Sequence, residues 1–272
     1  MRELASELAG LGSASVLWRA ASRQLSVRGL RRTPPIWREA RVLPELAALR
    51  RHPIAEGVGL PDGEGWPVFL IPGYMASDAS LAPMARALSS AGFRTELAGV
   101  RLNIGCANEM LGPIEARLEA HVAAHGGRKA FIVGQSRGGT FGRWLAARRP
   151  DLVRGLVTLG TPLRDPLAVN LLVLMNLGVV GTLGSLGMPG VLSTTCMRLD
   201  RCCEPAWREG AAPLPEGLPF LSIYSRSDGI VDWRACLDPT ARHLEVDSSH
   251  CGMAFNIEVL RAVGAELGRA AG

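Results

Sequence analysis

The chain has 272 residues, of which 47% are hydrophobic and 20% are charged. This composition excludes an intrinsically disordered protein, and the length suits one α/β domain with a single large core. The formal net charge is +5, and residues 1–60 account for it with ten arginines and five glutamates, so the remainder of the chain is electrically neutral.

Residues 1–60 form the first predicted unit, a helical segment that packs over the side of the domain that follows it. Its arginines are interspersed with apolar residues such as Trp18 and Trp37. A basic helix that carries tryptophan can lie on anionic lipid, so peripheral membrane contact is an alternative. Pro34 and Pro35 interrupt any long amphipathic surface and favour packing on the domain. Nucleic-acid binding is not expected, because no aromatic and basic module of a known type is present.

Residues 61–272 alternate between strand-like and helix-like segments. Strands are predicted near 68–71, 94–98, 129–133, 153–159, 219–224 and 243–247. Helices are predicted near 79–91, 108–125, 138–149, 233–237 and 254–270. Such alternation indicates the α/β class, with a mainly parallel sheet of about six strands flanked by helices. Residues at about 163–217 form an insertion between the fourth and fifth strands.

The motif Gly134-Gln135-Ser136-Arg137-Gly138 lies between the third predicted strand and the helix that follows it. A G-x-S-x-G in this position is typical of a nucleophile elbow, a tight turn that holds a serine in a strained backbone conformation. The turn also brings strand and helix too close for side chains two residues either side of the serine, where Gly134 and Gly138 lie. We therefore predict that Ser136 is a nucleophile rather than a serine in a structural glycine-rich turn.

A serine nucleophile needs a base to remove its proton and an acid to orient the base. In proteins with such an elbow, the chain order is serine, acid, histidine. Only His243 and His250 follow Ser136. His250 lies in the loop after the last predicted strand, whereas His243 opens that strand, where a solvated histidine is usual. We predict His250 as the base.

The acid is expected just after the fifth predicted strand. Asp228 comes first in that loop, and the apolar residues that follow it can fix the loop. Asp232 is the alternative, but it also suits the cap of a helix that starts near Trp233. Asp247 is closer to His250 in the sequence but lies at the end of the last strand. We predict Asp228 as the acid.

Acyl transfer places negative charge on a carbonyl oxygen, and backbone N–H groups must already be positioned to donate hydrogen bonds to that oxygen. One donor is expected from Arg137, the residue after the nucleophile, and the other from the loop after an earlier strand. The stretch Pro72-Gly73-Tyr74 follows the first predicted strand and fits that loop. We predict the N–H groups of Tyr74 and Arg137 as the oxyanion hole.

The segments IPGYMAS, GQSRGG, SRSDGIVDW and DSSHCGM occur in this order, and over about residues 66–270 the chain resembles the α/β-hydrolase superfamily, most of all bacterial esterases and lipases. The resemblance implies a catalytic triad of Ser136, Asp228 and His250, with Tyr74 and Arg137 at the oxyanion hole. Many members have His-Gly at the oxyanion loop and an apolar residue or a second histidine after the nucleophile, where this chain has Pro-Gly and Arg. These departures leave the substrate class open.

The insertion has no charged residue from Pro166 to Met197, and glycines fall at every third position from 178 to 190. A membrane-spanning helix here would separate Ser136 from Asp228 and His250, so the predicted triad argues against one. We expect an apolar helix near 166–177 and a flexible glycine tract after it, forming a cap or lid over the active site. A buried connecting helix is the alternative. The residues expected to line an acyl pocket are Leu171, Leu174 and Met175.

The six cysteines, at positions 106, 196, 202, 203, 236 and 251, match no spacing of a zinc site, and no bound metal is expected. Arg and Glu interrupt the apolar residues at the start of the chain, so no signal peptide is predicted. We therefore expect a cytoplasmic protein with free thiols. A disulfide between Cys236 and Cys251, which flank the acid and base loops, is the alternative and would brace the triad.

These features together predict a serine hydrolase that cleaves carboxylic esters, an esterase or lipase, through an acyl-enzyme and without a cofactor. The substrate is expected to be a small-molecule ester or lipid with an apolar acyl group. An acyltransferase with the same triad is the alternative. A haloalkane or epoxide enzyme is disfavoured, because it would carry Asp at the nucleophile position. A non-catalytic binding protein is disfavoured, because all three triad positions are filled.

Overall fold

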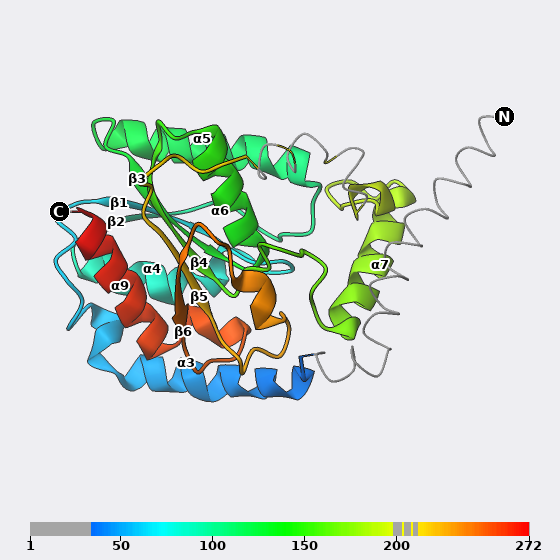
Figure 1. The fold of residues 1–272 in the computed structure, drawn as a ribbon, viewed down its shortest axis with the longest axis horizontal. Coiled ribbons are helices and arrows are strands. Elements are labelled where there is room, and N and C mark those ends of the chain that lie inside the picture. Colours follow the sequence, from blue (N-terminus) through cyan, green and yellow to red (C-terminus); the bar gives the residue numbers. More distant parts are fainter. Residues whose placement is uncertain (1–33, 198–202, 204–207, 209–211, 272) are drawn as a thin grey trace.

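The computed structural model describes residues 34–197, 203, 208 and 212–271 of the protein. In this part of the chain, six strands form one parallel sheet in the order β2-β1-β3-β4-β5-β6 (Figure 1). The predicted α/β class and parallel sheet are therefore confirmed. The strands are β1 (Pro67–Ile71), β2 (Arg94–Leu97), β3 (Ala130–Gln135), β4 (Val153–Leu159), β5 (Phe220–Tyr224) and β6 (Arg242–Glu245).

The strand sequences reflect their places in the sheet. β1 and β3 lie inside it and every one of their residues is buried, which explains the apolar runs PVFLI and AFIVGQ. β2 and β6 are the edge strands, and their sequences RTEL and RHLE remain partly exposed. Charged side chains at an edge discourage pairing with another sheet.

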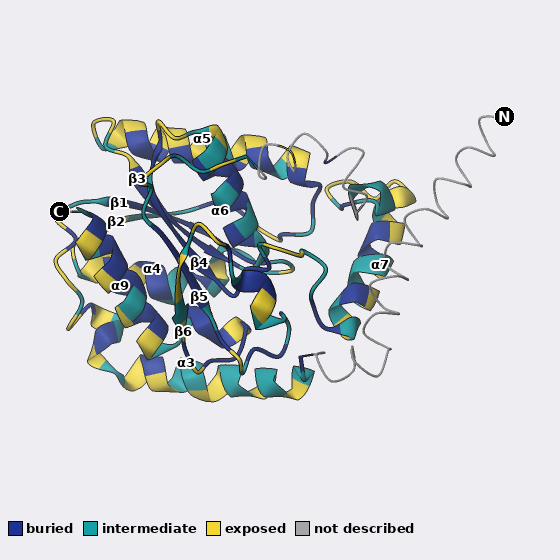
Figure 2. Cartoon of the chain, viewed as in Figure 1, coloured by how far each residue is buried: buried dark blue, intermediate teal, exposed yellow. Residues whose placement is uncertain are grey.

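Two layers of helices enclose the sheet (Figure 1). α4 (Ala82–Ser90) and α9 (Ile257–Ala271) pack on one face, and α5 (Ala107–Ala124) and α6 (Arg137–Arg148) on the other. Figure 2 shows that the helices turn their buried residues toward the sheet and their exposed residues outward. On α9, the buried residues Val259, Val263 and Leu267 recur every four positions and form the stripe that contacts the sheet.

Two helices near the carboxyl end differ from their predicted bounds. Trp233–Cys236 is a short 3₁₀ helix, η5, rather than an α-helix. α9 begins at Ile257 instead of 254, because Cys251–Ala254 form a separate 3₁₀ turn, η6. The side chain of Asn256 then accepts the N–H of Glu258 at 2.8 Å and starts α9. Polar residues that cap a helix compete with helix continuation, so element ends are the hardest part to predict.

The N-terminal segment is described from residue 34 onward. It forms η1 (Ile36–Arg41), α3 (Val42–Arg51) and η2 (Pro53–Glu56), and α3 lies beside α9 and η6 (Figure 1). Leu49 and Ile54 are buried in the core that α4 and α9 share with the sheet. Residues 1–33, with most of the arginines of the predicted basic segment, lie outside the described residues, so the membrane contact stays a prediction.

The insertion forms a helix, α7 (Leu171–Ser185), that stands apart from the two helix layers (Figure 1). The helix runs through the first glycines instead of ending near 177, which corrects the expected start of the glycine tract. At Gly184 the helix is approached closely by the chain that follows it, because a Cβ there would lie 2.1 Å from the carbonyl oxygen of Leu192. A 3₁₀ turn, η4 (Thr194–Met197), follows. Among the described residues, no helix has the length and hydropathy needed to cross a membrane.

Candidate active site

Ser136 lies at the sharp turn between β3 and α6. Its backbone has φ of +51° and ψ of −123°, a conformation that costs free energy for a residue with a side chain. The flanking glycines are required by packing. A Cβ on Gly134 would lie 2.5 Å from Cα of Gly139, and one on Gly138 would lie 2.1 Å from the carbonyl oxygen of Ile71. The turn therefore presents the serine above the carboxyl end of the sheet and leaves no room for side chains beside it.

Asp228 and His250 form a buried pair. Asp228 follows β5, and its Oδ2 lies 2.7 Å from His250 Nδ1. Its other oxygen, Oδ1, accepts the backbone N–H groups of Ile230 and Val231, each at 2.7 Å. Ile230 and Val231, the first apolar residues after Asp228, thus hold the carboxylate through their backbone N–H groups. The carbonyl oxygen of His250 accepts a hydrogen bond from the side chain of Gln135, the residue before the nucleophile, at 3.1 Å.

The pKa of His250 lies above its ordinary value. Burial disfavours the imidazolium, but the negative charge of Asp228 and the hydrogen bond to it outweigh burial. The pair therefore favours a positive charge on His250, which is the charge that a histidine acquires when it takes a proton from a serine.

The alternative acids and histidine have other partners. Asp232 accepts the backbone N–H of Arg234 at 3.1 Å and caps η5, as its alternative interpretation required. Asp247 is exposed and pairs with Arg41 at 2.8 Å. The Nε2 of His243 lies 2.8 Å from the carbonyl oxygen of Asp238.

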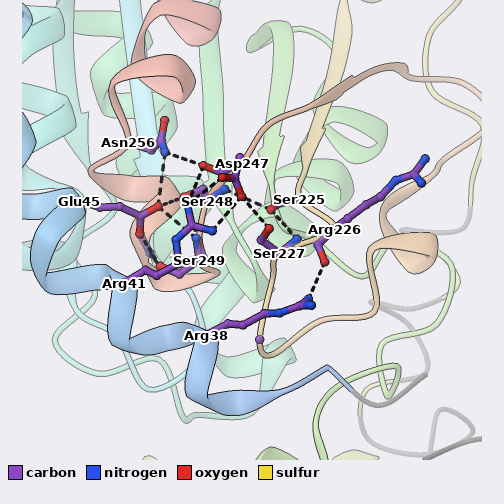
Figure 3. A network of polar contacts seen from close by, with 12 residues as sticks. Arg38, Arg41, Glu45, Ser225, Arg226, Ser227, Asp247, Ser248, Ser249 and Asn256 are labelled. Atoms are coloured by element: carbon purple, nitrogen blue, oxygen red, sulfur yellow. Dashed lines mark hydrogen bonds and ion pairs between the residues drawn. The ribbon is translucent and has the colours of Figure 1, made fainter. Parts of the chain in front are cut away.

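Two glutamates of the N-terminal segment hold the loops that carry the pair. Glu39 Oε1 accepts the N–H of Gly229 and the N–H of His250, both at 2.9 Å, and its Oε2 accepts the N–H of Cys251 at 2.9 Å. Glu45 accepts the hydroxyl of Ser248 at 2.8 Å and belongs to the network drawn in Figure 3.

Sequence reasoning missed both glutamates. Each lies about two hundred residues from its partners. The one available signal was the presence of acidic residues within a segment that is otherwise basic.

The loop after β1 approaches the nucleophile closely. A Cβ on Gly73 would lie 3.2 Å from Cβ of Ser136. The fully buried Asn103 fixes this loop, because it donates to the carbonyl oxygen of Pro72 at 2.8 Å and accepts the N–H of Met75 at 3.1 Å. Tyr74 lies between these contacts. No pattern in the sequence indicated Asn103.

Tyr74 and Arg137 are also held through their side chains. The Tyr74 hydroxyl donates to the side chain of Asn176 on α7 at 2.9 Å, and burial raises the pKa of Tyr74 to about 12. The Arg137 guanidinium donates to Asn103 Oδ1 at 2.9 Å and to the carbonyl oxygen of Gly105 at 2.6 Å. Arg137 is the first residue of α6, where a backbone N–H has no acceptor within the helix.

A cavity of about 600 Å³ lies over Ser136 and His250. Its wall combines the core with the insertion and is mostly apolar, with Phe141, Trp144, Leu167, Val173, Leu177 and Phe255 among its lining residues. The three residues predicted to line a pocket, Leu171, Leu174 and Met175, all lie on α7 but are not among the lining residues. Leu174 is buried against Val169, Val231 and Cys236, and Met175 is 60% exposed. Leu171 is not among the lining residues, whereas Leu172 is.

Cys236 and Cys251 are not joined to each other. Cys236 is buried and Cys251 is exposed, so the alternative of a disulfide between them is not realised. Cys106, Cys196 and Cys203 bring their sulfur atoms together, each within 4.8 Å of the others. In the described part of the chain, these three cysteines form the cluster that could bind a metal ion. The spacing of the cysteines in the sequence did not indicate it.

A parallel sheet between two helix layers, with a serine elbow after β3 and an acid–histidine pair after β5 and β6, defines the α/β-hydrolase fold, and this chain has that fold. A family model described as alpha/beta hydrolase fold matches residues 106–183. A comparison with curated proteins found no match.

Solved structures agree on the fold. A mature lipase from Bacillus licheniformis is similar with a TM-score of 0.54 and 16% identity, over 77% of this chain and 95% of that one. A monoacylglycerol lipase from Paleococcus ferrophilus has a TM-score of 0.51 and 18% identity, over 78% and 96%. The 2-hydroxy-6-oxo-6-phenylhexa-2,4-dienoate hydrolase of a Rhodococcus strain has a TM-score of 0.53 and 16% identity, over 77% and 92%.

Proposed function

We propose that the protein is a serine hydrolase that cleaves carboxylic esters, with Ser136, Asp228 and His250 as its catalytic triad. The observation that carries the proposal is the buried Asp228–His250 pair, 2.7 Å apart, at the same cavity as a serine with positive φ. A strained serine has no structural purpose where glycine would adopt the turn freely.

The reaction follows from these positions. His250 takes the proton of Ser136 Oγ as the oxygen attacks the ester carbonyl, and Asp228 holds the resulting imidazolium. The N–H groups of Tyr74 and Arg137 donate to the oxyanion. His250 then returns the proton to the leaving alcohol, which leaves an acyl-enzyme. A water molecule, deprotonated by His250, attacks the acyl group, and the acid and free serine are released. No cofactor takes part in these steps.

The cavity supports an apolar acyl group. Its lining side chains are mostly aliphatic and aromatic, and Arg137, Asp165 and His250 are the charged or titratable exceptions apart from Tyr74 and the cysteines. Burial of apolar groups contributes about 25 cal/mol per Å² to binding in such a cavity. The insertion supplies part of the wall, so we propose that it acts as a lid. The cytoplasmic location stays a prediction.

Hydrolysis of 4-nitrophenyl esters from acetate to palmitate tests the proposal. Wild type should turn over, and Ser136→Ala should lose activity by about 10⁶-fold, as removal of such a nucleophile does. Ser90→Ala, an exposed serine at the end of α4, is the matched control and should keep full activity. Equal rates in wild type and Ser136→Ala would overturn the assignment of Ser136. Product analysis with an added alcohol separates hydrolysis from acyl transfer.

A further inference from the structure

Three cysteines from separate parts of the chain meet at the wall of the cavity. Cys106 precedes α5, Cys196 lies in η4 of the insertion, and Cys203 also belongs to the insertion. Their Sγ atoms all lie within 4.8 Å of one another, and those of Cys106 and Cys203 are 3.6 Å apart. Cys106 and Cys203 are buried, and Cys196 is half-buried. The proposed ester hydrolysis uses none of them.

The spacing of the sulfur atoms suits a thiophilic metal ion. A tetrahedral zinc ion at about 2.3 Å from each thiolate places the sulfurs about 3.8 Å apart. The observed 3.6 Å between Cys106 and Cys203 is close to this value, and small rotations about the Cα–Cβ bond would bring Cys196 to it. Thiolate ligands select zinc or monovalent copper over magnesium, calcium and manganese, which prefer oxygen.

The charge around the cluster favours a divalent ion. The guanidinium of Arg137 interacts electrostatically with all three cysteines of the cluster. Burial lowers the pKa of Arg137 to about 10. In the described part of the chain its hydrogen-bond acceptors are uncharged oxygens of Asn103 and Gly105. A buried cation needs a counter-charge. Three thiolates with one divalent ion carry a net charge of −1, which matches the charge of Arg137, whereas a monovalent ion would leave −2.

We propose that Cys106, Cys196 and Cys203 bind one zinc ion as thiolates, with a water molecule in the fourth position. The ion would join the insertion to the start of α5 and would lie beside Arg137, the residue after Ser136. It would therefore hold the wall of the cavity in place. The three thiols release their protons to solvent on binding, because the ligands are thiolates.

The test begins with the full-length protein, reduced and freed of metal by a chelator. Cobalt(II) is added first, because thiolate-bound cobalt has an intense ligand-to-metal charge-transfer absorption, and zinc is then added to displace it. We expect one ion per chain. Cys106→Ser, Cys196→Ser and Cys203→Ser should each weaken binding by more than about 100-fold, because even changes outside the ligand set cost 10–100-fold. Cys236→Ser and Cys251→Ser are the matched controls and should bind as wild type does.

A second measurement needs no variant and stands even if a substituted protein fails to fold. Wild type is alkylated with a maleimide with and without zinc, and the labelled cysteines are identified by mass spectrometry. Zinc should protect Cys106, Cys196 and Cys203 and leave the exposed Cys251 reactive. Absence of metal binding, protection of other cysteines only, or a Cys106–Cys203 disulfide in reduced protein that takes up no metal would each overturn the proposal.

Discussion

The carboxylate of Glu39 accepts the backbone N–H of His250 at 2.9 Å, across 211 positions of the sequence. The same side chain accepts the N–H of Gly229, the residue after Asp228. One carboxylate of the N-terminal segment therefore holds the acid loop and the base loop to each other. The geometry of the proposed triad depends on a part of the chain that lies outside the sheet and its two helix layers.

Glu39→Ala should lower kcat by about 100-fold, because a small displacement of a catalytic group costs that much, and should change KM little. Glu39→Gln keeps one acceptor oxygen and should retain more activity than Glu39→Ala. Steady-state kinetics on a 4-nitrophenyl ester checks both. Glu56→Gln, an exposed glutamate in η2, is the control and should match wild type. A rise in KM alone would show that Glu39 positions the substrate and not the triad.

Asp228→Asn should lower kcat by about 10⁴-fold, since the histidine loses both its orientation and the charge that stabilises it. The pH dependence should also change. Only neutral His250 can accept the serine proton, so kcat/KM rises with pH through the pKa of His250 in the free enzyme. In wild type the midpoint of this rise, the acidic limb of the profile, should lie above the ordinary pKa of histidine, because Asp228 raises the pKa of His250.

In Asp228→Asn, only the charge of Glu39 still opposes burial, so the rise of kcat/KM should move to lower pH than in wild type. Profiles of kcat/KM from pH 5 to 9 for the two proteins give the comparison. A limb at the same pH in both would show that Asp228 does not face the catalytic histidine in solution.

Gly160→Ala should displace the acid–histidine pair. Gly160 has φ of +55°, and a Cβ there would lie 3.0 Å from Nδ1 of His250 and 3.2 Å from Oδ2 of Asp228. We expect a loss of about 1–2 kcal/mol in the free energy of unfolding from the backbone conformation, together with a fall in kcat. Urea denaturation and ester hydrolysis measure the two effects.

Gly126→Ala is the matched control for Gly160→Ala. Gly126 has φ of +68°, but nothing lies within 4 Å of a Cβ there. It should lose similar stability and keep its kcat. If both variants keep their kcat, contact with the acid–histidine pair is not the reason that position 160 requires glycine.

Arg41→Gln should remove a small, pH-dependent part of the stability. The hydrogen bond from Arg41, followed by that from Ser227, lowers the pKa of Asp247 to about 2. A carboxyl with a lowered pKa stabilises the folded state above its unfolded pKa of about 3.9, and the effect disappears as pH falls toward 2. Asp247 is exposed, so the pair should contribute no more than about 1 kcal/mol.

Urea denaturation at pH 6 and pH 3 tests this, with the exposed Arg101→Gln as control. The stability difference between wild type and Arg41→Gln should be smaller at pH 3. A difference that stays constant between the two pH values would assign the effect to packing of the Arg41 side chain.

Local sequence was sufficient where one short segment determines the outcome. β1 and β3 are buried on both faces, so they appear as apolar runs, and the glycines around Ser136 follow from the packing of one strand against one helix. The position of α7 was harder to predict. The helix is apolar on every side, so its periodicity could not indicate that Leu172 and Val173, rather than Leu174 and Met175, would line the cavity.

Features that combine residues from distant segments could not be predicted from the sequence. Glu39 reaches His250 only because η1 lies beside η6, and Cys106 meets Cys203 only because the insertion folds back toward α5. Neither contact can be predicted from the spacing of its residues in one sequence, because the number of residues between them depends on the fold and not on the contact.

The insertion carries no Asp, Glu, Lys, Arg or His from Pro166 to Met197. Apolar packing and uncharged hydrogen bonds, such as that between Tyr74 and Asn176, therefore hold α7 over the cavity. Dissolved ions screen charges but leave such contacts largely intact, whereas cooling weakens the apolar packing. Access to Ser136 should thus depend on temperature far more than on the salinity of the medium.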